Sequence, residues 1–417
     1  MFQCQNFGVP QMSINLETKK RTFIPYGRQW LDDEDVREVV KVLRGDWITQ
    51  GPAVRRFEEM LAHLVESKYA VAFSSGTAAL HAACFAAGIK PGDEVITTPI
   101  SFVATGNCIL YLGGKPIFVD VTEDTVNIDP EKIEEKITPR TKAIIPVDFA
   151  GHPAELERIY RIAIKNNLLV IEDACHALGA EYRSSDNSGL KGKDRWVKVG
   201  SCTHSHMSVF SFHPVKSITT GEGGAVTTND SYFYRKLILF RNHGITKDPS
   251  SFSGKNKDPW FYEMQELGYN YRITDFQCAL GMSQFRKLFL FIRRRRKIAR
   301  IYHQAFKDLK EISIPSEKPY VRSAWHLYVI RISPGKDRRK KVFEALRKEK
   351  MGVQVHYIPI YYHPYYQRLG YRKGICPVAE RYYERALTLP LFPKMRDEEV
   401  FQVIAKVRRV IREVENG

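Results

Sequence analysis

The chain has 417 residues, enough for a sizeable core and two domains, and its 43% hydrophobic and 27% charged content is ordinary for a soluble globular protein. No apolar stretch near the start has the length of a signal peptide. The longest one elsewhere, LFLFI before Arg293, is far below the roughly 18 residues of a membrane span. We therefore predict a soluble, cytoplasmic protein without a membrane partner.

The net charge of +17 is the clearest compositional bias. The runs RRRRK (293–297), DRRKK (337–341) and KVRRVIREV (406–414) contribute to it and have helical spacing, which favours solvated faces of C-terminal helices. A nucleic-acid partner is not expected, because no base-stacking or groove-reading module accompanies the charge. A general attraction for phosphorylated small molecules stays open.

Seven cysteines are scattered along the chain without a CxxC pair. Their odd number and apolar surroundings predict reduced, partly buried thiols rather than a disulfide framework.

Strand and helix patterns alternate from about residue 30 to 270. Helices are expected at residues 32–45, 76–88 and 154–167, and strands at residues 69–75, 93–99, 115–121, 141–149 and 167–174. This alternation predicts an α/β fold with a mostly parallel sheet flanked by helices. The polar segment 182–201 is expected to be a loop.

After about residue 290 the sequence changes to basic amphipathic helices with fewer strands. We expect an N-terminal arm at residues 1–25, a large domain at 26–285 and a smaller C-terminal α/β domain at 286–417.

The stretch FSSGTAALHAA places Ser75, Gly76 and Thr77 between a strand and a helix. Free backbone N–H groups and the positive end of a helix dipole suit a phosphate at such a position. Ordinary N-capping by a hydroxyl explains the same residues, so the motif alone leaves both interpretations open.

The stretch LLVIEDACHALGA ends a buried strand at Asp173, where the strand ends of a parallel sheet face the ligand crevice. A carboxylate there needs a cationic partner, and a structural ion pair is the alternative explanation. His176, three residues further on, is expected to share the pocket if the chain turns.

The stretch SVFSFHPVKSITTGEGG contains a single lysine, Lys216, after a strand broken by Pro214. Phe210, Phe212 and His213 are expected to shield its amine from water, which is the condition for a lysine nucleophile. A plain loop lysine remains the alternative for this motif alone.

Pyridoxal phosphate needs these three elements together: a reactive lysine, an acid at the pyridine nitrogen and a phosphate seat. It also needs a ring on the pyridine face, for which Phe102 in TTPISFVATGN is a candidate.

The segments FHPVKSITTGEGGAV, IEDACHALGA, SSGTAAL, TTPISFVAT and GYNYRITDFQCALG resemble the DegT/DnrJ/StrS-type nucleotide-sugar aminotransferases. The resemblance runs from about Tyr26 to the C-terminus. It implies PLP-dependent fold type I (aspartate aminotransferase-like), with a mostly parallel seven-stranded sheet, and a homodimer with shared active sites.

The resemblance also implies a role for each matched residue. Lys216 would hold the cofactor covalently and move protons, Asp173 would pair with the pyridine nitrogen, and Phe102 would stack on the ring. The phosphate would be held by Ser75, Gly76, Thr77 and Ser211, with Asn270 coming from the partner subunit. His176 stands where many members have a glutamine near the ring oxygen.

Substrate contact is implied for Tyr26, for Ile48, Thr49, Gln50 and Gly51, and for His356, Tyr357, Ile358 and Pro359. Segments such as VHYIPIYYHPYY are closest to the branch of the family that aminates C4 of a UDP-linked 2-acetamido-2,6-dideoxy-4-hexulose, with L-glutamate as donor. Another nucleotide-linked 4-keto or 3-keto sugar is the alternative within the family.

Two further alternatives stay open. A sugar dehydratase of the same fold is disfavoured by Lys216, because a histidine stands at that position in those relatives. A non-catalytic regulator or nucleic-acid-binding protein is suggested only by the charge.

CTHSH has the composition of a metal site but lacks a second ligand pair, so no metal is expected.

Overall fold

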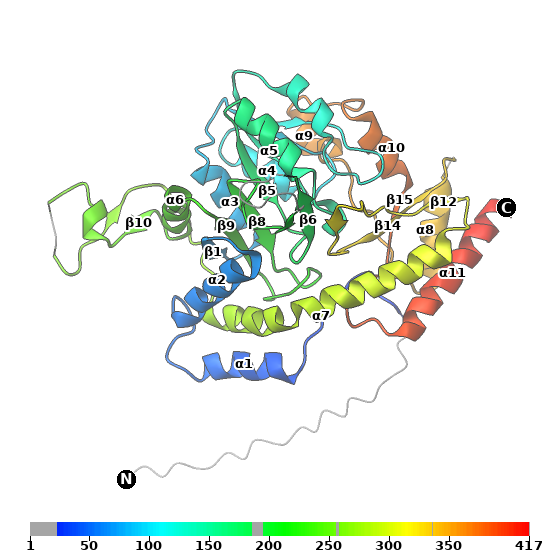
Figure 1. Ribbon diagram of the computed structural model, residues 1–417, viewed down its shortest axis with the longest axis horizontal. Helices are drawn as coiled ribbons and strands as arrows, with labels where there is room; N and C mark the ends of the chain where they lie inside the picture. Colours follow the sequence, from blue (N-terminus) through cyan, green and yellow to red (C-terminus); the bar gives the residue numbers. More distant parts are fainter. Residues whose placement is uncertain (1–22, 186–194, 256–257, 336, 417) are drawn as a thin grey trace, which may run out of the picture.

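The computed structural model describes residues 23–185, 195–255, 258–335 and 337–416. Most of the expected arm at residues 1–25 lies outside the described residues. Its last residues are described, and Ile24 is buried and forms a bridge with Met351 of the C-terminal part. Figure 1 shows the whole chain with its element labels.

A seven-stranded sheet forms the centre of the large domain (Figure 1). Its spatial order is β1 (Tyr69–Phe73), β9 (Gly224–Thr228), β8 (Met207–Ser211), β5 (Leu169–Asp173), β4 (Thr141–Ile145), β2 (Glu94–Thr97) and β3 (Lys115–Phe118). β9 runs antiparallel to both of its neighbours, and the remaining pairs are parallel. The predicted mostly parallel sheet of fold type I is confirmed.

The helices have the following bounds. They are α1 (Asp33–Leu43), α2 (Pro52–Val65), α3 (Gly76–Ala86), α4 (Ala104–Leu110), α5 (Leu156–Lys165), α6 (Ser231–Arg241), α7 (Asp275–Phe306), α8 (Arg338–Lys348), α9 (Pro364–Arg368), α10 (Pro377–Arg385) and α11 (Asp397–Asn416). Short 3-10 turns occur at Pro130–Lys132, Glu134–Lys136, Phe149–Gly151, Pro249–Ser251 and Ile360–Tyr362. The helices expected at 32–45, 76–88 and 154–167 correspond to α1, α3 and α5.

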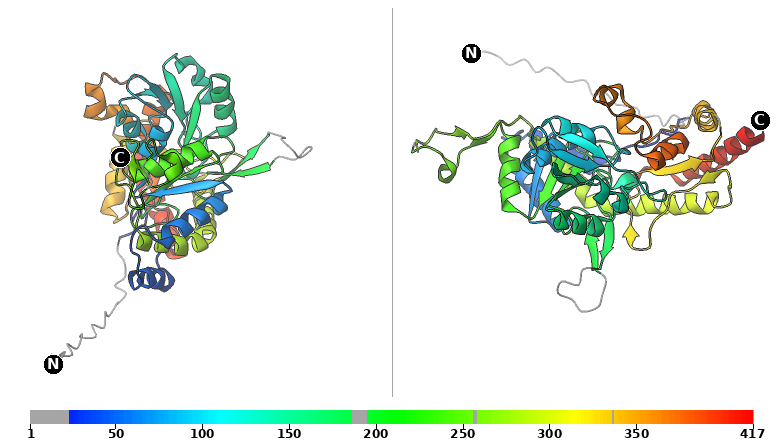
Figure 2. Two further views of the ribbon diagram at one scale, coloured as in Figure 1. Left: turned by 90° about the vertical axis from the view of Figure 1, so that its left-hand side faces the viewer. Right: turned by 90° about the horizontal axis from the view of Figure 1, so that it is seen from above.

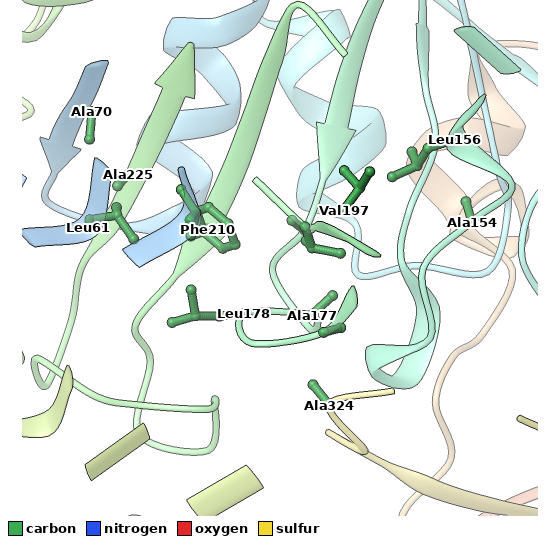
Figure 3. Packing of buried hydrophobic residues seen from close by; sticks show 14 of the residues in the cluster. Leu61, Ala70, Ala154, Leu156, Ala177, Leu178, Val197, Phe210, Ala225 and Ala324 are labelled. Carbon is green, nitrogen blue, oxygen red and sulfur yellow. The ribbon is translucent and has the colours of Figure 1, made fainter. Parts of the chain in front are cut away.

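Each face of the sheet has its own apolar cluster, because successive strand residues point to opposite sides. Ala72 faces the cluster built on α2, α5 and α7, whereas its neighbour Val71 faces the cluster built on α3, α4 and α6. Figure 3 shows part of the first cluster, in which Phe210 of β8 and Leu61 of α2 lie near each other. The sheet is therefore buried on both faces.

The C-terminal part contains a smaller sheet of β12 (Ile312–Ser313), β14 (Tyr328–Ile332) and β15 (Ala386–Leu389). Residues of α7, α8 and α11 pack on it in a separate apolar cluster. α7 is continuous from Asp275 to Phe306, so the predicted boundary at residue 286 falls inside a helix that serves both parts (Figure 1).

The segment 182–201 was expected to be a loop, and this expectation is wrong for its described flanks. β6 (Glu181–Ser184) pairs antiparallel with β7 (Arg195–Lys198), and β13 (Val321–Arg322) adds a third strand. Alternating polar and apolar residues such as Tyr182 and Val197, both buried, explain the pairing. The rest of the predicted insert lies outside the described residues.

A second hairpin, β10 (Ile245–Thr246) with β11 (Glu263–Met264), extends away from the body of the molecule in Figure 1 and in the right-hand view of Figure 2. We call its described residues, 245–255 and 258–267, the arm, which is distinct from the predicted N-terminal arm. Its described side chains include several large, exposed apolar groups.

The six cysteines within the described residues are all free thiols, and five of them are buried. Within the same residues, no helix combines the length and apolarity needed to cross a bilayer.

We predict that Phe285 is important for stability because it joins α7 to the large domain. Its ring stacks on Phe57 at 4.8 Å and meets Phe212 edge-on at 6.1 Å. Phe285→Ala should lower the free energy of unfolding by about 3–5 kcal/mol in guanidinium denaturation of the cofactor-free protein. Phe289 lies one turn further along the same helix and is 57% exposed, so Phe289→Ala should change the free energy of unfolding by no more than about 0.5 kcal/mol. Equal effects of the two changes would contradict the prediction.

Candidate active site

A cavity of about 480 Å³ lies where β5 and β8 end, beside the start of α3. The position follows from topology, because β5 and β8 are parallel and their carboxyl ends meet at one edge of the sheet. Its lining comprises Tyr26, Ser75, Gly76, Thr77, Leu80, Ser101, Phe102, Ala104, Thr105, Val147, Asp173, Cys175, His176, Ser211, His213, Val215, Lys216, Glu222, His326, His356 and Tyr357.

Asp173 is the last residue of β5 and is 3% exposed. Thr105 donates its hydroxyl to one carboxylate oxygen at 2.7 Å, and the backbone N–H of Cys175 donates to the other at 3.3 Å. The Thr105 hydroxyl is itself held by Ser101 at 2.7 Å. These bonds fix the orientation of the carboxylate.

The start of α3 has the features of a phosphate seat. Ser75 is the N-cap, and its hydroxyl accepts the N–H of Ala78 at 3.1 Å, so capping is one of its roles. The N–H groups of the first helical residues, Gly76 and Thr77, have no acceptor within the helix, and both residues line the cavity. A Cβ on Gly76 would lie 2.8 Å from Cβ of Ser211, so glycine allows Ser211 to approach the helix end.

Lys216 lies in a turn that follows β8, and its N–H donates to the carbonyl of His213 at 2.9 Å. Its amine faces the same cavity as Asp173. Burial lowers the pKa of the Lys216 ammonium, and the nearby Cys175 and Asp173 partly offset this effect. The amine is therefore more readily deprotonated than that of a surface lysine.

The predicted shielding of Lys216 by Phe210 and Phe212 is wrong. Both rings are fully buried in the core cluster on α2 and α7, because these two residues do not point to the cavity side of the chain. His213 does line the cavity but is itself exposed. The lining around Lys216 comes instead from Cys175, His326 and Tyr357.

Three aromatic groups close one side of the cavity. The Tyr357 hydroxyl and His176 Nε2 are 3.2 Å apart, and the rings of His176 and His326 have centroids 4.4 Å apart. Burial lowers the pKa of both imidazoles well below the ordinary value, and the charge of Lys216 adds to this effect. Both rings are therefore neutral at physiological pH.

The Nδ1 atoms of His176 and His326 are buried and have no hydrogen-bond partner within the described residues. Phe102, 59% exposed, lines the cavity with its ring 6.5 Å from that of Tyr357. The cavity thus offers neutral nitrogen atoms and aromatic faces for a bound ring.

Of the predicted substrate segments, Tyr26, His356 and Tyr357 reach the cavity. The rings of Tyr26 and His356 are 5.4 Å apart, and His356 Nδ1 is 2.8 Å from the Thr388 hydroxyl. The remaining members, Ile48, Thr49, Gln50, Gly51, Asn270, Ile358 and Pro359, do not line it within one chain. Asn270 is exposed and forms an isolated backbone bridge with Asn242. Ile48 is 52% exposed.

Thr105 and His326 are two of the lining residues that motif reasoning missed, and both contact predicted site residues. Thr105 follows Phe102 by three residues, the spacing that places two side chains on one face of a helical turn, which was an available signal. His326 belongs to a segment far along the chain, just before β14. No local pattern links it to His176.

The residues fit pyridoxal 5′-phosphate. A fixed carboxylate, a desolvated amine, a helix N-terminus beside a serine hydroxyl, and unpartnered imidazole nitrogens are the donor set that this cofactor uses. The site therefore defines a fold type I enzyme that acts on amino groups.

The chain belongs to the DegT/DnrJ/EryC1/StrS aminotransferase family, whose model matches residues 29–408. Pyridoxal phosphate is accordingly its cofactor. Putative sugar aminotransferase Spr1654 from Streptococcus pneumoniae is similar in structure, with a TM-score of 0.84 and 28% identity in its PLP form, covering 94% of this chain and 99% of that one. The same protein in its PMP form matches with 29% identity.

Other relatives match nearly the whole chain. Uncharacterized protein MJ1066 of Methanocaldococcus jannaschii is 44% identical, covering 94% of this chain and 99% of the relative. Spore coat polysaccharide biosynthesis protein SpsC of Bacillus subtilis is 39% identical, covering 94% and 98%. Helicobacter pylori PseC, an aminotransferase involved in the biosynthesis of pseudoaminic acid, is 35% identical with a TM-score of 0.83, covering 94% and 100%. The chain is thus a sugar aminotransferase of this family.

We predict that Thr105→Val weakens cofactor binding, because it leaves one buried oxygen of Asp173 without its donor. A lost bond to a buried charged group costs about 1–3 kcal/mol, so the cofactor dissociation constant should rise roughly 5- to 100-fold. It is measured by titrating cofactor-free protein with pyridoxal phosphate and following visible absorbance. Thr105→Ser keeps the hydroxyl and is expected to bind nearly as the wild type does. A Thr105→Val protein with unchanged affinity would contradict this role.

Proposed function

We propose that this protein transfers the amino group of L-glutamate to C4 of a UDP-linked 2-acetamido-2,6-dideoxy-L-arabino-hexulose, a 4-keto-6-deoxy sugar. The products are a UDP-4-amino sugar and 2-oxoglutarate, in a step of pseudaminic acid biosynthesis. The carrying observation is that Lys216, Asp173 and the start of α3 line one cavity. Similarity to PseC over 94% of the chain supports the choice of sugar.

The proposed chemistry divides between the cofactor and the protein. Pyridoxal phosphate, when bound, supplies a carbonyl group for the amine and an electron-withdrawing ring. Lys216 holds it and carries a proton between the substrate carbon and the ring system, a task for which a low-pKa amine is suited. Asp173, fixed by Thr105, keeps the pyridine nitrogen protonated.

The other residues bind and orient. Ser75, Gly76, Thr77 and Ser211 hold the phosphate in this proposal, and Phe102 covers the ring. His176 donates or accepts at the ring oxygen, with its own orientation set by the Tyr357 hydroxyl. Tyr26 and His356, together with Tyr357, contact the sugar nucleotide.

A homodimer completes the proposed site. Asn270, Ile358 and the loop of residues 48–51 are exposed or half-buried outside the cavity of their own chain, which is consistent with contacts made across an interface; Pro359 is buried within its own chain. The arm supports the same proposal: Trp260 and Leu267 are 76% and 75% exposed, and Met264 is 64% exposed. Apolar groups that gather in this way mark an interaction surface.

A different nucleotide-linked keto-sugar is the second candidate. SpsC acts in spore coat polysaccharide biosynthesis, and its 39% identity is higher than the 35% of PseC. Both candidates use the same protein groups and differ only in the sugar that the cavity accepts.

We predict that incubation with L-glutamate and the L-arabino-type UDP-4-keto sugar yields a UDP-4-amino sugar and 2-oxoglutarate, detected by mass spectrometry. Lys216→Ala should reduce the rate by about 10⁴-fold or more, because the proton carrier is lost. Conversion of another nucleotide-linked keto-sugar, with no conversion of this one, would reject the pseudaminic assignment and retain the family. Activity retained in Lys216→Ala would reject the mechanism.

We also predict that Leu267→Glu breaks the dimer, because a charge in an apolar interface is left without a partner. Sedimentation should show a shift from dimer to monomer, and pyridoxal phosphate binding should weaken with it. Phe401→Glu is a matched control: Phe401 is 59% exposed on α11, in the C-terminal part, and its substitution should leave the dimer intact. A Leu267→Glu protein that remains dimeric would contradict an interface at the arm.

A further inference from the structure

Arg295 occupies an unusual position within the basic run RRRRK. The run was expected to be a solvated helix face, and this holds for Arg293, which is exposed on α7. It is wrong for Arg295, which is 1% exposed and ranks among the largest fully buried side chains of the described residues. Helical spacing explains the difference, since Arg295 shares the inward face of α7 with Leu288, Ile292 and Ala299.

Main-chain carbonyl groups surround the Arg295 guanidinium. One terminal nitrogen donates to the carbonyls of Leu391 at 2.9 Å, His326 at 3.1 Å and Trp325 at 3.4 Å. The other donates to the carbonyl of Val215 at 3.4 Å. Among the described residues, no ion pair with a carboxylate is formed by this arginine.

A buried charge without a counter-ion is costly unless dipoles replace the lost water. Burial lowers the pKa of the Arg295 guanidinium to about 10, so the group stays charged at physiological pH. A salt bridge would neutralise such a charge, whereas here only carbonyl dipoles stabilise it. The arrangement is thus suited to holding several backbone segments at one point rather than to pairing with one side chain.

The segments held by Arg295 all belong to the active site or adjoin it. Val215 directly precedes Lys216 and lines the cavity. His326 lines the same cavity and stacks on His176 at 4.4 Å. Leu391 follows β15 of the smaller sheet, and its N–H donates to the carbonyl of Tyr26, another lining residue.

We propose that Arg295 is a positioning residue that fixes the Lys216 turn against the C-terminal part of the chain and thereby keeps the Lys216 amine in the desolvated interior of the cavity. This proposal rests on the proposed role of Lys216 in the reaction. Without Arg295 the turn gains freedom, water reaches the amine, and the amine is protonated over a wider pH range.

The test measures the ionisation of Lys216 directly in cofactor-free protein. Acetic anhydride at low concentration acetylates neutral amines, and peptide mass spectrometry reports the extent at Lys216 as a function of pH. In the wild type the midpoint should lie below that of exposed lysines such as Lys340. In Arg295→Gln the midpoint should rise by about one pH unit, which is about a tenfold loss of neutral amine at fixed pH.

Two further variants separate the causes. Arg295→Lys keeps a positive charge but cannot reach all four carbonyls, so the Lys216 midpoint should rise in this variant as well. A Lys216 midpoint equal to that of the wild type would show that the charge of Arg295, rather than its positioning of the turn, is responsible, and would overturn the proposal. Arg296 is the matched control, because it is the next residue on α7 and also donates to main-chain carbonyls, those of Ser323 at 2.9 Å and Arg322 at 3.2 Å. Arg296→Gln should leave the Lys216 midpoint unchanged.

A folded Arg295→Gln protein with an unchanged midpoint overturns the proposal, and so does an equal shift in Arg296→Gln. If neither Arg295 variant folds, hydrogen exchange in the wild type decides: amides of residues 215–218 should be protected as well as those of β8, and exchange as fast as in the exposed segment 247–254 overturns it. A wild-type midpoint equal to that of Lys340 instead rejects the proposed role of Lys216, and with it this proposal.

Discussion

The carboxylate of Asp173 sits at the end of a central strand and is almost completely removed from water. A charge at such a position is stable only if donors and an opposite charge are provided for it. The molecule provides donors on both sides, through the Thr105 hydroxyl and the Cys175 N–H, and directs the Lys216 amine into the same cavity. The parallel neighbours of β5 bury Asp173, α4 supplies Thr105, and the turn after β8 supplies Lys216. The cofactor site thus depends on the hydrogen bonds that stabilise the buried Asp173 carboxylate at the end of β5.

A second buried charge, that of Arg295, lies behind the lysine turn at the junction of the two parts of the chain. The two charged groups are stabilised differently. Hydroxyl and amide donors stabilise the Asp173 carboxylate, and carbonyl dipoles stabilise the Arg295 guanidinium. Lys216 is linked to both charges. The carbonyl of the preceding residue, Val215, accepts a hydrogen bond from Arg295, and Lys216 lines the same cavity as Asp173. Its lowered pKa follows from burial at this place.

Much of this arrangement was predictable from local patterns. Strand ends followed by small and polar residues pointed to Ser75 and Asp173, and the parallel sheet does bring both to the cavity, whereas Ser211 was expected there only from the family resemblance. The pattern failed where a contact depends on distant segments. His326 reaches His176 only through the packing of the C-terminal part, and Arg295 is buried only because α7 lies between both apolar clusters. The flanks of the 182–201 segment pair directly with each other as β6 and β7, and the distant β13 adds a third strand; the polar composition of the segment as a whole led to the wrong prediction of a loop. Contacts across a subunit interface, as proposed for Asn270, likewise leave no mark within a single chain.

The measurement that tests the account most directly is the identification of the lysine that holds the cofactor. The holoenzyme is reduced with borohydride, digested, and mapped by mass spectrometry for the pyridoxyl group. We expect the label on the peptide containing Lys216 and on no other, and we expect prior denaturation to abolish it. A label on a different lysine, or none on Lys216 in folded holoenzyme, would show that the amine lining the cavity with Asp173 is not the group that holds the cofactor.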